Sequence, residues 1–253
     1  MCGRFVSSST PEQIAAHFGA EVATDTLGPN FNVAPTHDVY GVVADAGGDV
    51  AAGDVGVGGR RVDAFHWGLV PSWAKDRKVG YKMINARAET LAEKPAFKKL
   101  FATRRCIVPM DGFYEWMPGT ADGPRTKAGK PAKRPVFVRR VDGEPLAVAG
   151  LWTVWKDPDA DPDESDGADR WLHSATVVTT SANATMAPVH DRMPVILTDA
   201  SAWDVWLDPA MDDLDELGAL LVPAPADLIT LHEVSTEVND VRNRGAHLVE
   251  PVG

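Results

Sequence analysis

The second residue of the chain, Cys2, is the first candidate for chemistry. Because the residue after the initiator methionine is small, we expect Met1 to be removed and Cys2 to become N-terminal. Its α-amine, with a reference pKa of about 7.7–8.0, is then partly neutral at pH 7, and its thiol is a nucleophile once ionised. Such an aminothiol captures an aldehyde as a Schiff base, which the thiol closes to a thiazolidine. Taken alone, Cys2 is also explained as a chance cysteine.

The segment His190-Asp191-Arg192-Met193-Pro194 offers a second set of reactive groups. A histidine moves protons near neutral pH, and an arginine two residues away can hold a phosphate through two parallel hydrogen bonds. It follows a predicted strand and loop that include Thr179. The plainer alternative is a turn with a surface His-Asp pair.

A third segment, Asp111 to Trp116 (DGFYEW), places Glu115 between two aromatic residues. A carboxylate in such surroundings is costly to ionise, so its pKa can be raised into a range that suits acid–base work. Aromatic neighbours such as Trp116 can also stack on unpaired bases. The alternative is a strand end with core aromatics and a solvent-facing glutamate.

The segment Asn85 to Thr90 (NARAET) carries an amide, a guanidinium and a carboxylate at alternating positions. In an extended strand, Asn85, Arg87 and Glu89 would point to one face and form a polar strip. The alternative is a surface strand with a salt bridge. Cys106 lies in an apolar run, where an inert core cysteine is expected.

The elements that must position these groups can be read from local patterns. Thr10 as N-cap, Pro11 at the first helical position and Gln13 as capping-box partner predict a helix that runs to Phe18 and stops at Gly19. The other expected elements are strands at 38–44, 64–70, 105–110, 136–141, 146–155, 174–180, 231–234 and 247–249, and helices at 95–101, 201–207 and 211–221. Short strands without a βαβ rhythm predict an α+β fold with mostly antiparallel pairing. Residues 46–60, 117–135 and 156–170 are expected loops within one domain, 1–253.

Charge is unevenly distributed along the chain. The net charge is −11, which disfavours nucleic acid as a partner of the chain as a whole. Residues 60–140, however, hold 19 Lys/Arg and 7 Asp/Glu, a net of +12, and the remainder carries −23. This distribution allows a basic face on an acidic body, or only a surface that maintains solubility.

Several protein classes are excluded. The apolar content of 44% supplies a core, and no apolar run approaches the roughly 18 residues that a membrane-spanning helix needs. The N-terminus does not read as a secretory signal. Two cysteines fit a reducing cytosol and exclude a disulfide scaffold, and the sequence contains no CxxC or HExxH motif that would suggest a metal.

Taken together, these segments resemble the SRAP family (SOS-response-associated peptidases, also called abasic-site processing proteins) over almost the whole chain. The matching segments, in family order, are MCGRF (1–5), NVAPT (32–36), WGLVPSW (67–73), NARAET (85–90), DGFYEW (111–116), AGLW (149–152), HDRMP (190–194) and the tail 234–251.

The resemblance implies a single compact α+β domain with a barrel-like, mostly antiparallel sheet core and flanking helices. It also implies covalent attachment to abasic sites in single-stranded DNA through a thiazolidine on Cys2, with AP-lyase-type chemistry and peptidase-type removal of Met1. Asn85 would position Cys2, Glu115 would act as acid–base group and His190 would donate a proton. The residues expected to bind DNA or shape its groove are Arg4, Asn32, Pro35, Trp73, Arg87, Trp116, Thr179 and Arg192.

No cofactor and no metal are expected. The expected partner is single-stranded DNA that contains abasic sites, with no membrane association. We further expect a monomer in the cytoplasm that associates with the nucleoid during repair. Two alternatives stay open from the residues: a cysteine-dependent peptidase that acts on other proteins, and a non-catalytic single-strand DNA-binding module.

Overall fold

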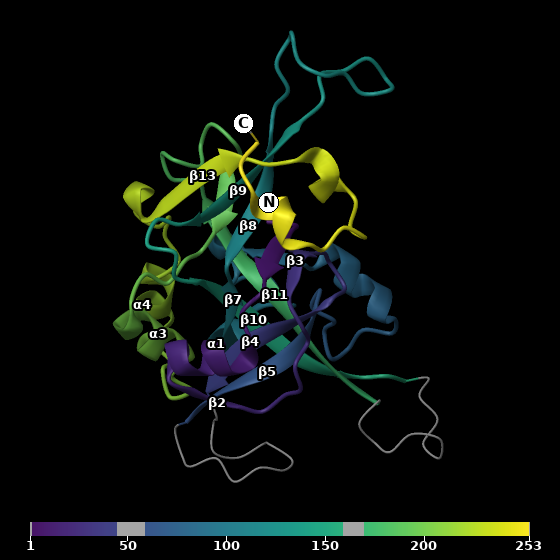
Figure 1. Cartoon of the computed structure of the whole chain (residues 1–253). Coiled ribbons are helices and arrows are strands. Elements are labelled where there is room, and N and C mark those ends of the chain that lie inside the picture. The colour runs from purple at the N-terminus through teal and green to yellow at the C-terminus, as the bar shows by residue number, and fades with distance from the viewer. Residues whose placement is uncertain (1, 45–58, 159–169, 253) are drawn as a thin grey trace.

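The computed structural model describes residues 2–44, 59–158 and 170–252. Two β-structures dominate it, a closed barrel and a second, separate antiparallel sheet (Figure 1). The glycine-rich loop expected at 46–60 and the acidic loop expected at 156–170 lie almost wholly outside the described residues. The expected α+β class with a barrel-like, mostly antiparallel core is confirmed.

The barrel forms from five strands. Antiparallel pairs join β11 to β10, β10 to β7, β7 to β4 and β4 to β5, and a short parallel pair between β11 and β5 closes the ring. Its strands are β4 (Asp38–Ala44), β5 (Arg60–Trp67), β7 (Arg105–Met110), β10 (Leu146–Lys156) and β11 (Trp171–Ser181). Three short strands extend it at its edges: β2 (Ala20–Val22) on β5, and β6 (Asn85–Arg87) and β12 (Arg192–Pro194) on β11.

The second sheet has the order β13-β9-β8-β1-β3 and is antiparallel throughout. Its strands are β1 (Phe5–Ser7), β3 (Asn30–Val33), β8 (Gly112–Met117), β9 (Arg134–Arg140) and β13 (Ile229–Glu233). The chain passes from the barrel to this sheet through Asp111, which separates β7 from β8. Gly112 is required there, because a Cβ would lie 2.3 Å from the ring of Phe137.

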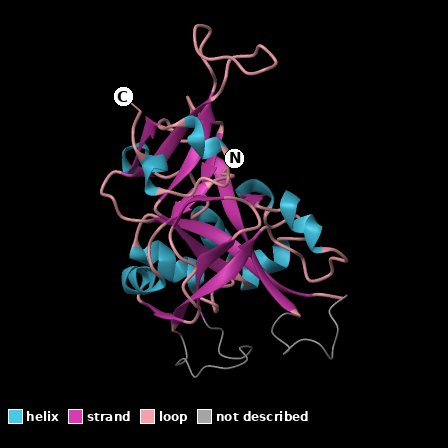
Figure 2. Cartoon of the chain, turned by 45° about the vertical axis from the view of Figure 1, so that its right-hand side comes forward, coloured by secondary structure: helices cyan, strands magenta, loops and turns pink. Residues whose placement is uncertain are grey.

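The α-helices lie against the barrel, whereas 3-10 turns of the C-terminal segment lie on the second sheet (Figures 1 and 2). The α-helices are α1 (Pro11–Phe18), α2 (Lys98–Thr103), α3 (Ala200–Leu207) and α4 (Leu214–Ala219). The 3-10 turns are η1 (Arg77–Lys82), η2 (Ala88–Thr90), η3 (Ala226–Leu228), η4 (Thr236–Asn239) and η5 (Ala246–Val249). No helix among the described residues has the length and apolar content needed to span a bilayer.

The first helix forms as its caps predict. The Thr10 side chain accepts from Gln13 N, the Gln13 side chain accepts from Thr10 N, and Gly19 ends the helix at φ +61°. The helix expected at 211–221 is shorter, because the Asp213 side chain caps it and fixes its start at Leu214.

Two expected strands differ most from the structure. The strand predicted at 64–70 begins at Arg60 and ends at Trp67, since Gly68 turns the backbone at φ +134°. The strand predicted at 247–249 is wrong, because these residues belong to η5. Leu248 donates its N–H to Gly245 O there and buries its side chain against the second sheet.

Successive side chains along each strand point to opposite faces of the second sheet, and both faces are buried. On its inner face, Phe5 and Phe113 join a core shared with the barrel, and this core also contains Cys2. On its outer face, Tyr114 and Phe137 pack beneath the C-terminal segment through Val238. The N-terminal residues therefore lie between the barrel and the second sheet.

Candidate active site around Cys2

Cys2 is fully buried in the core between the barrel and the second sheet. The strand that follows it is fixed on both sides, since Phe5 pairs with Phe113 on β8 and with Val33 on β3. The Asn85 amide donates to the Cys2 carbonyl oxygen at 2.7 Å. A residue at the very start of the chain is therefore held as firmly as a core residue.

Asn85 reaches Cys2 because of a non-local strand pairing. It begins β6, which runs parallel to β11 with Asn85 opposite Val177. The Val177 N–H donates to Ile84 O at 3.1 Å, which fixes the backbone just before the amide. The family resemblance implies that Asn85 positions Cys2, and the pairing of β6 with β11 brings its amide to Cys2.

Glu115 lies on β8, where it pairs with Val136 of β9, and it is 5% exposed. Its negative charge acts on the Cys2 thiol. Burial first, and then this charge, raise the pKa of the Cys2 thiol to about 12, while the backbone N–H of Arg4 acts in the opposite direction. The thiol is therefore protonated at neutral pH, and the carboxylate is its electrostatic neighbour.

His190 lies on the loop between β11 and β12. Arg192 N donates to its Nδ1 at 3.0 Å, and Asp191 Oδ1 lies 2.8 Å from the same nitrogen. The backbone N–H needs a lone pair on Nδ1, whereas the carboxylate favours a proton there, so the two contacts favour opposite protonation states. The preceding Met186 and Val189 pack in the same core as Cys2.

Arg192 is already engaged. Its guanidinium forms two hydrogen bonds with the Glu89 carboxylate and donates to the Thr179 carbonyl at 2.6 Å. The fully buried Thr179 is thus part of the support for Arg192. The expectation that Glu89 shares a strand face with Asn85 and Arg87 is wrong, because β6 ends at Arg87 and Glu89 belongs to η2.

Two of the predicted groove residues fasten the C-terminal segment. The fully buried Asn32 donates its amide to three carbonyls of that segment, those of Val238, Asp240 and Asn243. Arg4 donates to Asn32 Oδ1 at 2.7 Å and to Val238 O at 2.8 Å. Asn32 and Arg4 therefore hold the C-terminal segment in place.

Trp116 contacts the C-terminal segment and Arg4. Trp116 donates its ring N–H to Asn239 Oδ1 at 2.7 Å, and the Arg4 guanidinium carbon lies 5.8 Å from the Trp116 ring centre. Trp73 is 67% exposed, and Pro35 is half-buried. Tyr81, which the sequence did not single out, is 61% exposed among the basic residues of η1.

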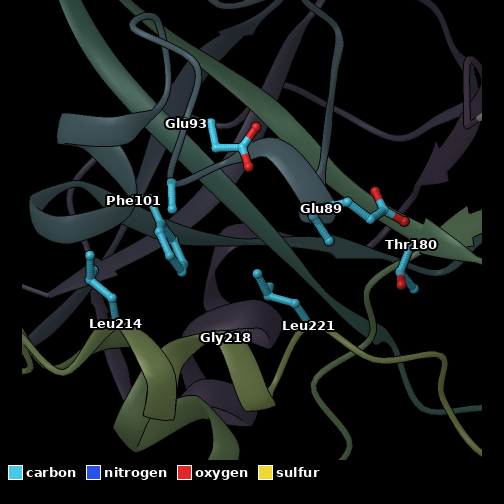
Figure 3. Close-up of a pocket in the computed structure, with 9 residues that line it drawn as sticks. Glu89, Glu93, Phe101, Thr180, Leu214, Gly218 and Leu221 are labelled. Atoms are coloured by element: carbon cyan, nitrogen blue, oxygen red, sulfur yellow. The ribbon is translucent and has the colours of Figure 1, made fainter.

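A cavity of about 280 Å³ lies apart from the predicted catalytic residues (Figure 3). In Figure 3, Glu93 lies on the side of Phe101 and Glu89 on the side of Thr180, and α4 supplies the facing wall with Leu214 and Gly218. Glu89 thus adjoins this cavity and also pairs with Arg192. In the part of the chain that the structure describes, no three His, Cys, Asp or Glu side chains are grouped as a metal site would need.

The sequence model of the SOS response associated peptidase (SRAP) family matches residues 1–241. The Bacillus subtilis protein named abasic site processing protein YoqW is 38% identical over 252 residues, 99% of each chain. The Escherichia coli protein named abasic site processing protein YedK is 29% identical over 260 residues, 100% of each chain. Abasic site processing protein HMCES of Xenopus tropicalis is 36% identical over 195 residues, 73% of this chain and 55% of its own.

Solved structures share the fold. A protein from Bacteroides thetaiotaomicron superimposes with a TM-score of 0.77 at 22% identity, covering 99% of this chain and 100% of that one. A phage-related protein from Bordetella bronchiseptica gives 0.63 at 26% identity, covering 92% and 94%.

Proposed function

The chain belongs to the SOS response associated peptidase (SRAP) family, and from that premise we propose that it recognises abasic sites in single-stranded DNA and bonds to them through Cys2. Relatives from bacteria and a vertebrate are named abasic site processing proteins, which supports processing of this lesion. The observation that carries the proposal is the grouping of Cys2 with the Asn85 amide and the Glu115 charge at the start of the chain.

The reaction begins when the α-amine of Cys2 is exposed by removal of Met1. An unprotonated amine attacks the C1′ aldehyde of the ring-opened deoxyribose, and loss of water leaves an imine. The thiol then adds across the C=N bond: sulfur bonds to carbon and the thiol proton ends on nitrogen. Atoms balance with water as the only by-product, so the thiazolidine needs no oxidant, metal or organic cofactor.

Glu115 is suited to proton transfer in both steps. A newly exposed α-ammonium would share the Cys2 site with the Glu115 carboxylate, which can accept its proton and leave the nucleophilic amine. Since burial and Glu115 keep the thiol protonated, sulfur attack must follow imine formation and be coupled to proton removal. Glu115 is therefore a catalytic residue in this scheme.

Asn85 and His190 take different roles. Asn85 orients Cys2 by holding its carbonyl, so that amine and thiol approach the aldehyde from one residue. His190, half-exposed and tied through Nδ1 to its own loop, would donate a proton to the sugar oxygen during ring opening. Arg87 and Arg192 would bind the flanking phosphates, and for Arg192 this means competition with Glu89.

Closure to the ring explains why a covalent product protects DNA. A Schiff base hydrolyses readily, and β-elimination from it cuts the strand. The thiazolidine removes the imine and leaves the strand intact. Exposed Trp73 and half-buried Pro35 would separate bases beside the lesion.

The test is cross-linking to a single-stranded oligonucleotide with one abasic site, resolved on a denaturing gel. Wild type whose intact mass shows loss of Met1 should give a heat-stable shifted band, and Cys2→Ala should not. Cys106→Ala is the matched control, because it removes the other buried cysteine and should retain the band. No band with the mature wild type, or a heat-stable band with Cys2→Ala, would contradict the proposal.

A further inference from the structure

A hairpin arm, residues 118–133, extends from the end of the second sheet away from the body of the molecule (Figure 1, teal loop at the top). It joins β8 to β9, the two strands that hold Glu115. Two residues separate Glu115 from the end of β8, about 7 Å of strand. The arm therefore begins beside the proposed site of covalent attachment.

The arm is strongly basic on an acidic protein. It carries Arg125, Lys127, Lys130 and Lys133 against one acid, Asp122, a net of +3, whereas the whole chain has −11. All four basic residues are exposed. Among the residues that the structure describes, none of the three lysines is within ion-pair distance of a carboxylate. Their charge is available to a partner.

The arm also has a defined shape. The Arg125 guanidinium donates to Gly129 O at 2.9 Å and Ala121 O at 3.2 Å, which makes it an internal brace. Backbone bonds cross the hairpin from Ala132 N to Pro124 O and from Thr126 N to Lys130 O.

Two glycines permit this shape. Gly119 allows the two sides of the arm to approach each other, since a Cβ there would lie 2.2 Å from Ala132 O. Gly129 takes φ +75° in the turn. A braced hairpin presents its lysines with less loss of conformational entropy on binding than an unstructured loop would.

We infer that this arm is a second nucleic-acid-binding element, which contacts backbone phosphates of the lesion-bearing DNA beyond the nucleotides held at Cys2. The inference rests on the proposed function. About seven extended residues on each side give a reach of about 20 Å, which spans roughly six phosphates at the 3.4 Å spacing of one strand of a duplex and fewer on an extended single strand. Cationic side chains without acidic partners fit a polyanion, and they fit no apolar ligand.

The test is equilibrium binding to DNA with a tetrahydrofuran abasic analogue, which cannot form the imine, measured by fluorescence anisotropy against salt. The oligonucleotides carry either about three or about twelve nucleotides on each side of the lesion. Wild type should bind the long one more tightly. The variant Lys127→Ser/Lys130→Ser/Lys133→Ser should lose that advantage. The slope of log K against log salt should become about 2 less steep, near 0.7 per lost contact, with about tenfold to a hundredfold weaker binding near 0.1 M salt.

The control variant Lys94→Ser/Lys98→Ser/Lys99→Ser removes the same charge from exposed positions in α2 and just before it. This helix packs through Phe101 in a hydrophobic cluster that does not include Cys2, so the control variant should behave as wild type. Long substrates with a flank on only the 5′ side or only the 3′ side, each single-stranded or annealed, identify which backbone the arm contacts. An arm variant that keeps the wild-type length advantage and salt slope overturns the inference, as expected if the arm binds an acidic protein instead.

Failure of the inference differs from failure of the proposed function. If the arm variant cross-links a short oligonucleotide with a true abasic site at the wild-type rate, the Cys2 chemistry stands whatever the arm does. If wild type cross-links nothing, the proposed function fails first.

Discussion

Replacing Asn85 tests whether its side chain acts on Cys2 through a hydrogen bond or only by filling space. Its amide nitrogen lies 2.7 Å from the Cys2 carbonyl oxygen, and Cys2 is fully buried. Asn85→Ala removes the donor and leaves a space. Asn85→Asp keeps the volume but sets a carboxylate oxygen against the carbonyl oxygen. The two variants therefore differ in electrostatics at this contact.

The magnitude follows from the cost of an unsatisfied buried carbonyl, about 1–3 kcal/mol. If that cost falls on the reactive geometry of Cys2, Asn85→Ala should slow cross-linking by roughly 5- to 150-fold, at about 1.4 kcal/mol per factor of ten. At pH 7.5, Asn85→Asp should be slower still, because its ionised oxygen repels the carbonyl. Below the pKa of the new carboxyl, its proton can donate, so the rate of Asn85→Asp relative to wild type should recover.

The assay is the single-turnover rate of band formation on a denaturing gel, measured from pH 5 to 8 with excess protein. Urea unfolding of each variant controls for damage to β6. The reasoning is refuted if Asn85→Asp reacts as fast as Asn85→Ala at pH 7.5, or if both recover equally at pH 5. Either result would mean that the amide only fills space.

Three further predictions follow from buried charge and buried donors. Glu115→Gln should lower the pKa of the Cys2 thiol from about 12, because the carboxylate's charge raises that pKa; ultraviolet titration of the thiolate in a Cys106→Ala background measures it, and an unchanged titration would show that burial alone sets the pKa. Above about pH 9 the folded protein should lose stability, because burial raises the pKa of the Cys2 and Cys106 thiols, so the unfolded chain releases their protons first. Each thiol lowers the unfolding free energy by about 1.4 kcal/mol per pH unit in this range. Cys106→Ala should therefore flatten the decline measured by urea unfolding. Arg105→Lys should lower the unfolding free energy by about 2–4 kcal/mol, because the buried guanidinium donates to five carbonyls and an ammonium cannot reach them all; a change below about 0.5 kcal/mol would contradict this.

Local patterns were enough wherever the deciding contacts lie within a few residues. Thr10, Gln13 and Gly19 predicted the first helix from its capping chemistry, and the structure confirms each contact. Short runs of apolar residues likewise predicted the barrel strands β4 and β7 with their bounds. The strand predicted at 247–249 failed because a single buried leucine does not distinguish a strand from a 3-10 turn.

The sequence by itself determined which chemical groups are available: a cysteine at position 2, an amide, a carboxylate among aromatics and a histidine, in the order of one family. Only the tertiary structure decided how they are used. It joins Asn85 to Cys2, 83 positions away, and Arg192 to Glu89, 103 positions away, through hydrogen bonds. It also places Asn32 where its amide binds carbonyls of the C-terminal segment. Contacts at such separations depend on strand pairing and barrel closure, which no local pattern encodes, because each requires segments that meet only after the chain has collapsed.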